Sequence, residues 1–520
     1  MPPMAQKPRR IAAIDVGTNS IHMIIVECRG RSCRVIDKEK EMVLLGEGSL
    51  GGEPLTEEAI GRAVDAISRM AEIARRGEVD RIEAVATSAV REAPNRKQFA
   101  REVEKAAGIP LRIITGHEEA DLIFRAVRSA VDFHGETALC IDIGGGSLEL
   151  IAGSREEIHY ATSEPLGALR LTEKFLKSDP PTVDEIRACR KHVRKLLKKP
   201  VAAVRAGGFG FCIGTSGTIT TLAELAAESG DADPVAAGLR WLGRARLEEL
   251  IETLALLSAA ERAETLNLDP RRAQTILAGA IALDEFMRLA RVGRLRACSA
   301  ALREGIIEKV LEESTPSRSR VEAGGVRRTS VLELARRTDA DLDHARHVAI
   351  LATRIFDQTR ALHELDDGAR ELIEYAALLH EAGLHISWKG HHKHAYYLIR
   401  HAELRGFTQE QVAVIANLAR YHRKAKPSTK HDSFNELAEE QQLIVERGTA
   451  ILRMANALDR GRSHAVRDVE VALENGSASF ILKSKGAAGL EVEASRKNAK
   501  HFGKVFGVVA AIEVHPGSRK

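Results

Sequence analysis

The chain has 520 residues, 44% of them hydrophobic and 29% charged, which is ordinary for a soluble globular protein and too long for one core. Its net charge of +4 gives no global field toward nucleic acid, and no apolar run reaches the ~18 residues that span a bilayer. Six cysteines without Cys-x-x-Cys spacing, and a polar opening segment unlike a signal peptide, indicate a reducing compartment. We therefore expect a cytoplasmic protein of several domains that binds no nucleic acid and has no membrane span.

The first part of the chain alternates predicted strands with predicted helices, which is typical of an α/β sheet. Short apolar runs that end at turn residues predict the strands, and an apolar period of 3.6 residues predicts the helices. Thr56 is the expected N-cap of the first helix. The predicted strands lie at 11–27 (with a turn inside), 33–45, 82–90 and 111–116, and the predicted helices at 57–75, 95–107 and 118–130.

One supersecondary unit occurs twice. The segment ALCIDIGGGSLELIAG at 138–153 repeats the apolar and polar pattern of residues 11–26. The aligned pairs are Asp15 with Asp142, Gly17 with Gly144, and Ser20 with Ser147. A repeat of this kind predicts two similar lobes that face each other, with the ligand site in the cleft between them.

The second part of the chain is predicted to be mainly helical, with histidines concentrated between 330 and 460 and short strands after Val466. The polar, glycine-containing segment 317–328 is a candidate linker. The expected domains are lobe I over 1–133, lobe II over 134–314, a helical domain over 329–462 and a small α+β domain over 463–520.

Three glycine-containing turns are candidate phosphate-binding loops. Two follow the repeated strands, and the third, GTSGT at 214–218, precedes a predicted helix N-terminus. Glycine lets the backbone approach a phosphate closely, so that successive N–H groups and nearby hydroxyls can donate to its oxygens. A single turn of this type is usually only a turn, but two homologous copies that each follow an aspartate favour a phosphate site. The candidate residues are Gly17, Asn19, Ser20, Gly145, Gly146, Ser147, Thr215, Ser216 and Gly217.

Duplicated lobes with paired phosphate loops resemble the sugar kinase–actin superfamily. The segments ATSAVREAPN (86–95), ITGHEEADLIF (113–123) and IDIGGGSLEL (141–150) make the chain similar to the exopolyphosphatase / guanosine pentaphosphate phosphatase family. The resemblance covers about 1–310 and continues at 380–401 and 420–427. It implies actin-like (sugar-kinase-like, ribonuclease H-like) α/β lobes, hydrolysis of phosphoanhydrides, and a homodimer.

The same resemblance assigns the catalytic base to Glu119, the second glutamate of the G-x-E-E-A motif. Water is a poor nucleophile, and a carboxylate within hydrogen-bond reach can orient and deprotonate it. Glu118 is expected to do no more than complement the helix dipole. Arg91 resembles the guanidinium that grips the terminal phosphate, although most arginines are simply solvated.

Carboxylates near the repeated turns are the expected metal ligands. Asp142 and Glu149 resemble the metal-associated carboxylates of the family, and Asp15 is the counterpart of Asp142 in the first repeat. The expected ion is Mg²⁺, which neutralises charge on phosphoanhydride oxygens. Glu149 lies two residues past Ser147, so strand alternation puts both on one face, and the first repeat has His22 at this place.

The helical part contains the order of residues found in HD phosphohydrolases, namely His347, His380–Glu381, His394, His422 and Asp459. That pattern needs an aspartate directly after the second histidine to hold a metal. Here Glu381 takes its place, so we expect an HD-like domain without a competent metal site.

The expected function is therefore that of an exopolyphosphatase, which releases terminal phosphate from inorganic polyphosphate. Hydrolysis of guanosine pentaphosphate by the same residues is the nearest alternative, because terminal phosphoanhydrides look alike at the point of cleavage. A kinase of the wider superfamily and a non-catalytic sensor of polyphosphate or alarmone remain open alternatives. The basic segment 420–426 and the HHKH run at 391–394 could bind a long polyanion.

Overall fold

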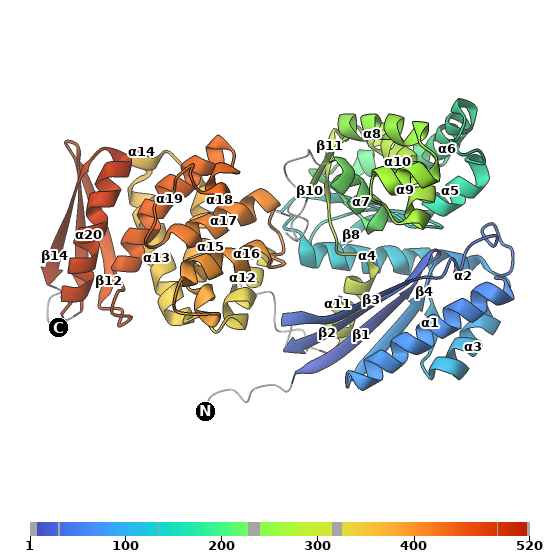
Figure 1. Cartoon of the computed structure of the whole chain (residues 1–520), viewed down its shortest axis with the longest axis horizontal. Coiled ribbons are helices and arrows are strands. Elements are labelled where there is room, and N and C mark those ends of the chain that lie inside the picture. The colour runs from blue at the N-terminus through green and yellow to red at the C-terminus, as the bar shows by residue number, and fades with distance from the viewer. Residues whose placement is uncertain are drawn as a thin grey trace. The chain divides into compact units, whose positions relative to one another are not determined.

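The computed structural model describes residues 8–29, 32–133, 135–226, 240–314, 325–485 and 487–516 (Figure 1). Its contacts divide the chain into two compact units, unit 1 up to residue 314 and unit 2 from residue 325. Over these ranges, no helix combines the length and the apolar character that a bilayer crossing requires.

The first sheet of unit 1 has the strand order β3-β2-β1-β4-β5. β1 pairs antiparallel with β2 and parallel with β4. Alternate residues of β1 enter different cores: Ala12 and Ile14 pack with α1 and α3, whereas Ile11 and Ala13 pack with α4 and α11. The elements are β1 (Arg9–Val16), β2 (Ser20–Arg29), β3 (Ser32–Met42), α1 (Glu57–Arg76), β4 (Arg81–Ala86), α2 (Ser88–Glu92), α3 (Arg96–Ala107), β5 (Leu111–Ile113) and α4 (Gly116–Ala130).

The second sheet repeats this topology. Its order is β10-β11-β9-β6-β7-β8, in which β6 pairs antiparallel with β7 and parallel with β9, as β1 does with β2 and β4. The two α/β lobes expected from the sequence repeat are thus present. The elements are β6 (Ala138–Ile143), β7 (Leu148–Gly153), β8 (Ile158–Glu164), α5 (Ala168–Phe175), α6 (Val183–Gly207), β9 (Phe211–Thr215), α7 (Ser216–Ala226), β10 (Arg240–Gly243), α8 (Arg244–Leu256), α9 (Ala259–Thr265), α10 (Pro270–Ala290), β11 (Arg294–Ala297) and α11 (Leu302–Ser314).

Several helix boundaries follow from local chemistry. The Thr56 side chain accepts a hydrogen bond from the Ala59 amide and begins α1, as predicted. The strand predicted over 82–90 is too long, because β4 ends at Ala86 and α2 begins at Ser88. Of the predicted linker, residues 317–324 lie outside the described residues, and 325–328 form the first turn of α12.

The α6–α10 contact of lobe II is held by a buried carboxylate. Glu285 on α10 is 1% exposed and is bound by Arg194 of α6 at 3.0 Å, by Arg190 and by Arg288. Burial raises the pKa of Glu285, but its bonds to the three arginines lower it by more, so that it lies below its ordinary value.

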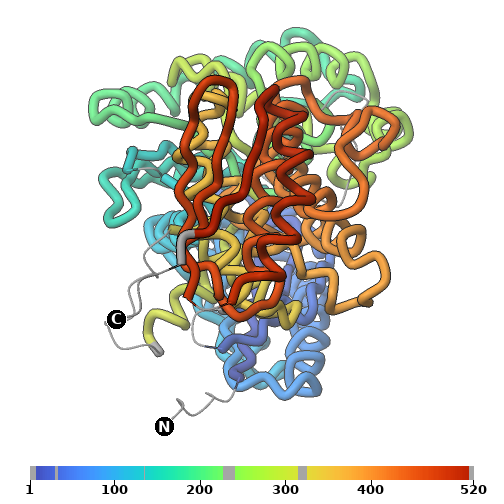
Figure 2. Tube along the Cα trace, turned by 90° about the vertical axis from the view of Figure 1, so that its left-hand side faces the viewer, coloured from blue at the N-terminus to red at the C-terminus, as the bar shows by residue number. Residues whose placement is uncertain are grey.

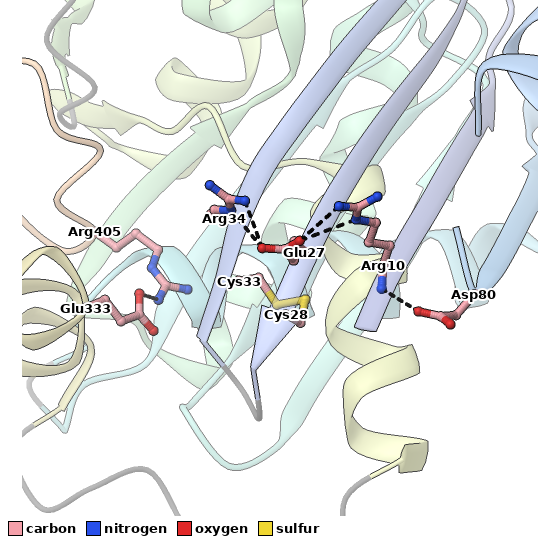
Figure 3. Close-up of a disulfide and its surroundings, with 8 residues drawn as sticks. All are labelled: Arg10, Glu27, Cys28, Cys33, Arg34, Asp80, Glu333 and Arg405. Atoms are coloured by element: carbon pink, nitrogen blue, oxygen red, sulfur yellow. Dashed lines mark hydrogen bonds and ion pairs between the residues drawn. A yellow bond between two sulfur atoms is a disulfide. The ribbon is translucent and has the colours of Figure 1, made fainter. Parts of the chain in front are cut away.

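A disulfide joins Cys28 and Cys33 across the β2–β3 hairpin (Figure 3). The cysteine spacing did not predict this bond, which forms because the antiparallel register places the two residues opposite each other with Cα atoms 4.0 Å apart. Beside the disulfide, Glu27 accepts hydrogen bonds from Arg10 and Arg34. The four remaining cysteines (140, 189, 212 and 298) are free and buried.

Unit 2 has one core, to which both the helices and the C-terminal strands contribute. β13 pairs antiparallel with β12 and parallel with β14, and α20 lies beside these strands (Figure 2). The elements are α12 (Gly325–Arg337), α13 (Leu342–Gln358), α14 (Arg360–His363), α15 (Asp367–Leu379), the 3₁₀ helix η1 (Ala382–His385), α16 (His391–Arg400), α17 (Gln409–Tyr421), α18 (Asp432–Asn435), α19 (Glu439–Ala457), β12 (Val466–Glu474), β13 (Ser477–Ser484), α20 (Gly489–Phe506) and β14 (Val509–Pro516).

Candidate active site

The two repeated turns have the same internal hydrogen bond. The Gly17 amide donates to the Ser20 carbonyl at 3.1 Å, and the Gly144 amide donates to the Ser147 carbonyl at 3.0 Å. Each turn connects an antiparallel pair, β1–β2 or β6–β7. The duplication seen in the sequence is therefore also a duplication of backbone geometry.

The turns of the two lobes approach each other so closely that glycine is required in the second one. A Cβ atom on Gly145 would lie 2.9 Å from Asn19 Oδ1, and one on Gly146 would lie 2.6 Å from Ser88 Oγ. Because the turns face each other, the backbone amides and side chains of both lobes are available to one ligand.

Four carboxylates surround this meeting point. Asp15 and Asp142 lie at the ends of the central strands β1 and β6, Glu149 lies on β7 opposite Asp142, and Glu119 lies in the first turn of α4. Burial, and then the repulsion among them, raises the pKa of Asp15 to about 7 and that of Asp142 to about 8. The pKa values of Glu119 and Glu149 are raised as well, by burial first. A cluster of this kind requires a cation or protons to be stable.

Glu119 is paired with Arg91. Its Oε2 accepts a hydrogen bond from Arg91 Nη1 at 2.7 Å, and Glu119 is only 7% exposed. Arg91 also donates to the carbonyl of Ile114, so the guanidinium is fixed between α2 and the start of α4. The Thr115 side chain caps α4 and thereby sets the position of its first turn.

Glu149 has one satisfied and one unsatisfied oxygen. Its Oε1 accepts from Ser163 Oγ at 2.7 Å, and Ser147 also donates to this carboxylate, as strand alternation predicts. Glu149 Oε2 and Asp15 Oδ1 are buried and have no hydrogen-bond partner among the described residues. In the first lobe the equivalent pair is Ser20 and His22, whose Oγ and Nε2 lie 2.7 Å apart.

These unpaired carboxylate oxygens fit a hard divalent cation. Mg²⁺ prefers oxygen ligands and is usually held by one or two carboxylates together with water and substrate phosphates. Asp15, Asp142 and Glu149 are the residues that would hold it. Within the described ranges, the ligand atoms of these three do not all lie within 4.8 Å of one another, whereas direct ligands of one Mg²⁺ stand at most about 4.2 Å apart. At least one of the three would therefore hold the ion through water or a phosphate oxygen.

The third predicted loop, 214–218, is instead the junction of a strand and a helix. Thr215 is the last residue of β9 and Ser216 the first residue of α7. The Thr215 hydroxyl donates to the Ala300 carbonyl at 2.5 Å, and the Ser216 hydroxyl donates to the Ile143 carbonyl at 3.0 Å. Both hydroxyls are therefore occupied by the backbone, and what remains for an anion is the N-terminus of α7 at Gly217.

The sequence predictions did not include three cationic side chains near the site, namely Lys40, Arg272 and Arg303. Burial, and then the charges of Arg303, Lys40 and Arg272, lowers the pKa of His22 to about 3. Arg303 also lies close enough to Asp15 to lower its pKa, and it forms no hydrogen bond or ion pair with any described residue. His22 lies opposite Asp15 in β1 and opposite Lys40 in β3, so strand register, and no sequence motif, places Lys40 near the site.

Comparisons with known proteins identify the family of the chain. Residues 24–314 match the Ppx/GppA phosphatase family, and residues 326–492 match Ppx/GppA phosphatase, domain III. A family member from Aquifex aeolicus is 26% identical with a TM-score of 0.53, over 60% of this chain and 100% of its own. An exopolyphosphatase from Cytophaga hutchinsonii is 28% identical with a TM-score of 0.56, over 59% of this chain and 98% of its own. The chain belongs to the Ppx/GppA phosphatase family.

Proposed function

We propose that this phosphatase is an exopolyphosphatase that removes the terminal phosphate of inorganic polyphosphate. The observation that carries the proposal is the buried Glu119–Arg91 pair next to three further carboxylates and two facing glycine turns. The turns suit phosphate oxygens, the carboxylates suit a cation, and Glu119 is the group that can accept a proton from water.

In the proposed reaction, Glu119 orients a water molecule and takes one of its protons. Burial raises the pKa of Glu119, which brings it closer to the operating pH and makes it a stronger base than an exposed glutamate. The water oxygen forms a bond to the terminal phosphorus while the bond to the bridging oxygen breaks. Arg91 holds the terminal phosphate through nitrogen atoms that Glu119 does not use.

Mg²⁺ is the proposed cofactor, and when bound it neutralises charge on the bridging and terminal phosphate oxygens. Asp15, Asp142 and Glu149 hold it in this proposal. Serine hydroxyls keep the Glu149 carboxylate oriented, because Ser163 and Ser147 both donate to it.

Guanosine pentaphosphate is the second candidate substrate, since its terminal phosphoanhydride can use the same residues. Two observations favour the polymer. Lys40, Arg272 and Arg303 extend the site with cations beyond the carboxylates, and one structural relative at 28% identity is an exopolyphosphatase. An extended polyanion gains from every additional cation it reaches.

A comparison of kcat/KM for the two substrates, at equal Mg²⁺, tests this assignment. We expect the value for long-chain polyphosphate to be higher by at least about tenfold, which corresponds to ~1.4 kcal/mol of transition-state binding. Equal or higher efficiency with guanosine pentaphosphate would overturn the polymer assignment and leave the catalytic residues unchanged. Release of no phosphate from either would overturn the hydrolytic function itself.

A further inference from the structure

A second group of buried polar residues lies in unit 2, where several helices end. His380 and His422 are the C-cap residues of α15 and α17, and His344 lies in the first turn of α13. His344 and His380 have ring centroids 5.4 Å apart, and those of His380 and His422 are 5.0 Å apart. His344, and not the predicted His347, faces this cluster; His347 bonds to the Val466 carbonyl at 2.8 Å.

His344, His380 and Glu381 bring their ligand atoms within 4.8 Å of one another. Across the part of the chain that the structure describes, this is the one set of three metal-ligating side chains that does so. His344 and His380 are buried, and Glu381 retains 11% side-chain exposure, so the cluster is reached from the glutamate side.

Hydrogen bonds on the far side of each ring fix the tautomers. His380 Nδ1 lies 2.7 Å from the Ala377 carbonyl, and His344 Nδ1 lies 2.8 Å from Asp459 Oδ2. Carbonyl and carboxylate oxygens only accept, so Nδ1 carries the proton in both rings and Nε2 has the lone pair. Metal-ligating histidines usually have this arrangement, with the second nitrogen bound to a carbonyl or carboxylate.

His380 Nε2 is an unusual atom in this cluster. It is fully buried, and it has no hydrogen-bond partner among the described residues. A buried nitrogen lone pair without a donor is costly unless a ligand fills the place in front of it. The helix C-termini that carry His380 and His422 also favour positive charge at this position.

Arg462 neutralises the carboxylate of the cluster. Its Nη2 donates to both oxygens of Glu381, at 2.6 and 2.8 Å, and its Nη1 donates to Asp341 at 3.2 Å. The cluster contains three carboxylates, namely Asp341, Glu381 and Asp459, and Arg462 is bonded to two of them. One guanidinium does not balance the charge of three carboxylates, so an added cation would be stabilised here. Because Arg462 keeps a partner in Asp341, it can leave Glu381 without becoming unpaired.

Against the expectation drawn from the glutamate at position 381, we propose that unit 2 binds one divalent transition-metal ion through Nε2 of His344, Nε2 of His380 and the carboxylate of Glu381. Two imidazoles and one carboxylate suit Zn²⁺, Mn²⁺, Co²⁺ or Ni²⁺, whereas Mg²⁺ and Ca²⁺ prefer oxygen ligands alone. Ligands around one such ion stand about 3.4 Å apart, given metal–ligand bonds of about 2.1 Å. The ligand atoms therefore have to move closer together when the ion binds. The Glu381 side chain can make this movement when it releases Arg462, because it has one methylene more than an aspartate and is flexible.

The test uses the full chain, stripped with a chelator and then equilibrated with Zn²⁺ in excess Mg²⁺, which occupies the carboxylates of unit 1. Metal analysis after gel filtration should find about one Zn²⁺ per wild-type chain. His380→Ala should weaken Zn²⁺ binding by about 10-fold or more, the scale expected for loss of a ligand or its support. His401→Ala, which changes a histidine at the C-cap of α16 outside the cluster, is the matched control and should bind Zn²⁺ as wild type does.

Arg462→Gln provides a result that misfolding cannot produce, because it should tighten Zn²⁺ binding by removing the competing guanidinium. With Co²⁺ in place of Zn²⁺, the visible absorption of the bound ion should be present in wild type and absent in His380→Ala. A wild-type chain that retains no ion overturns the proposal, whatever the variants hold. Retention that is the same in wild type and His380→Ala overturns it as well.

Discussion

Glu118 and Glu119 are neighbours in the chain, yet the fold gives them opposite surroundings. Glu118 points to the outside of α4 and forms ion pairs with Arg112 and Lys309 at 2.9 and 3.2 Å. Glu119 points inward to Arg91 and the other carboxylates. One step along a helix turns a side chain by about 100°, which is enough to separate a solvated ion pair from a buried base.

Glu119→Gln should therefore lower kcat for phosphate release by at least about 100-fold, because the amide cannot accept the proton from water. Circular dichroism and the thermal midpoint should stay close to wild type. Glu118→Gln is the matched control, with the same chemical change one residue away, and should retain nearly full activity. A Glu119→Gln protein that keeps more than a tenth of wild-type kcat would contradict the role of the base.

Arg303 gives a second prediction at this scale. Its guanidinium is unpaired among the described residues and lies near Asp15, so it is available to a substrate phosphate. Arg303→Gln should raise KM for polyphosphate by about tenfold, the loss of one charge-assisted hydrogen bond, with a smaller change in kcat. Arg187→Gln, which removes a surface partner of Asp184, serves as the comparison and should leave KM unchanged.

Single residues differ in how far the sequence could predict them. Asp15, Asp142 and the glycines were predictable because a repeat places them at equivalent strand ends. Arg303 and Lys40 were not predictable, because neither lies in a motif. Strand pairing places Lys40 opposite His22, and the tertiary fold brings Arg303 on α11 near the same residue. Thr215 and Ser216 were predicted as phosphate donors from composition, which does not reveal that the backbone already uses their hydroxyls.

At the scale of elements, the contact between α6 and α10 depends on one carboxylate among three arginines. Glu285 has a lowered pKa in the folded protein. Its stabilising contribution is therefore fully present above the ordinary glutamate pKa, about 4.3 to 4.5, and is lost as pH falls through the lower folded-state value.

Glu285→Gln should lower the free energy of unfolding by about 3 kcal/mol at pH 7, since it leaves arginines beside a neutral amide in a buried place. Urea denaturation at several pH values measures this difference. The gap between variant and wild type should narrow below about pH 4, where the native carboxylate becomes protonated. A gap that stays constant down to pH 3 would show that packing, and not charge, explains the loss.

Elements were predicted well where periodicity is strong and poorly where it changes within a few residues. The amphipathic helices α1 and α4 were found together with their positions along the chain. The run AVATSAV at 84–90 contains small and β-branched residues and no charge on either side of Thr87, so the change from β4 to α2 there has no signal in hydrophobicity. The disulfide was missed because cysteine spacing says nothing about which residues face each other in a hairpin.

At the scale of the whole molecule, the cations around His22 predict a marked salt dependence for long substrates. Exposed charges more than about 8 Å apart are screened at an ionic strength of 0.15 M. Raising NaCl from about 50 to about 300 mM should increase KM for long-chain polyphosphate several-fold, with kcat nearly constant. Tripolyphosphate should show a smaller increase because it reaches fewer cations, and equal increases for both would argue against an extended binding path.

The equivalent places of the two lobes hold different residues: Ser147 and Glu149 in one, Ser20 and His22 in the other. Duplication alone would give the site a two-fold axis, and the exchange of glutamate for histidine removes it. Inorganic polyphosphate has identical ends and no direction of its own. In a site that has a carboxyl group at one repeat and a neutral imidazole beside cations at the other, the two ends of such a polymer become different only on binding. Under the proposed function, broken symmetry is what allows an enzyme to impose polarity on a substrate that has none.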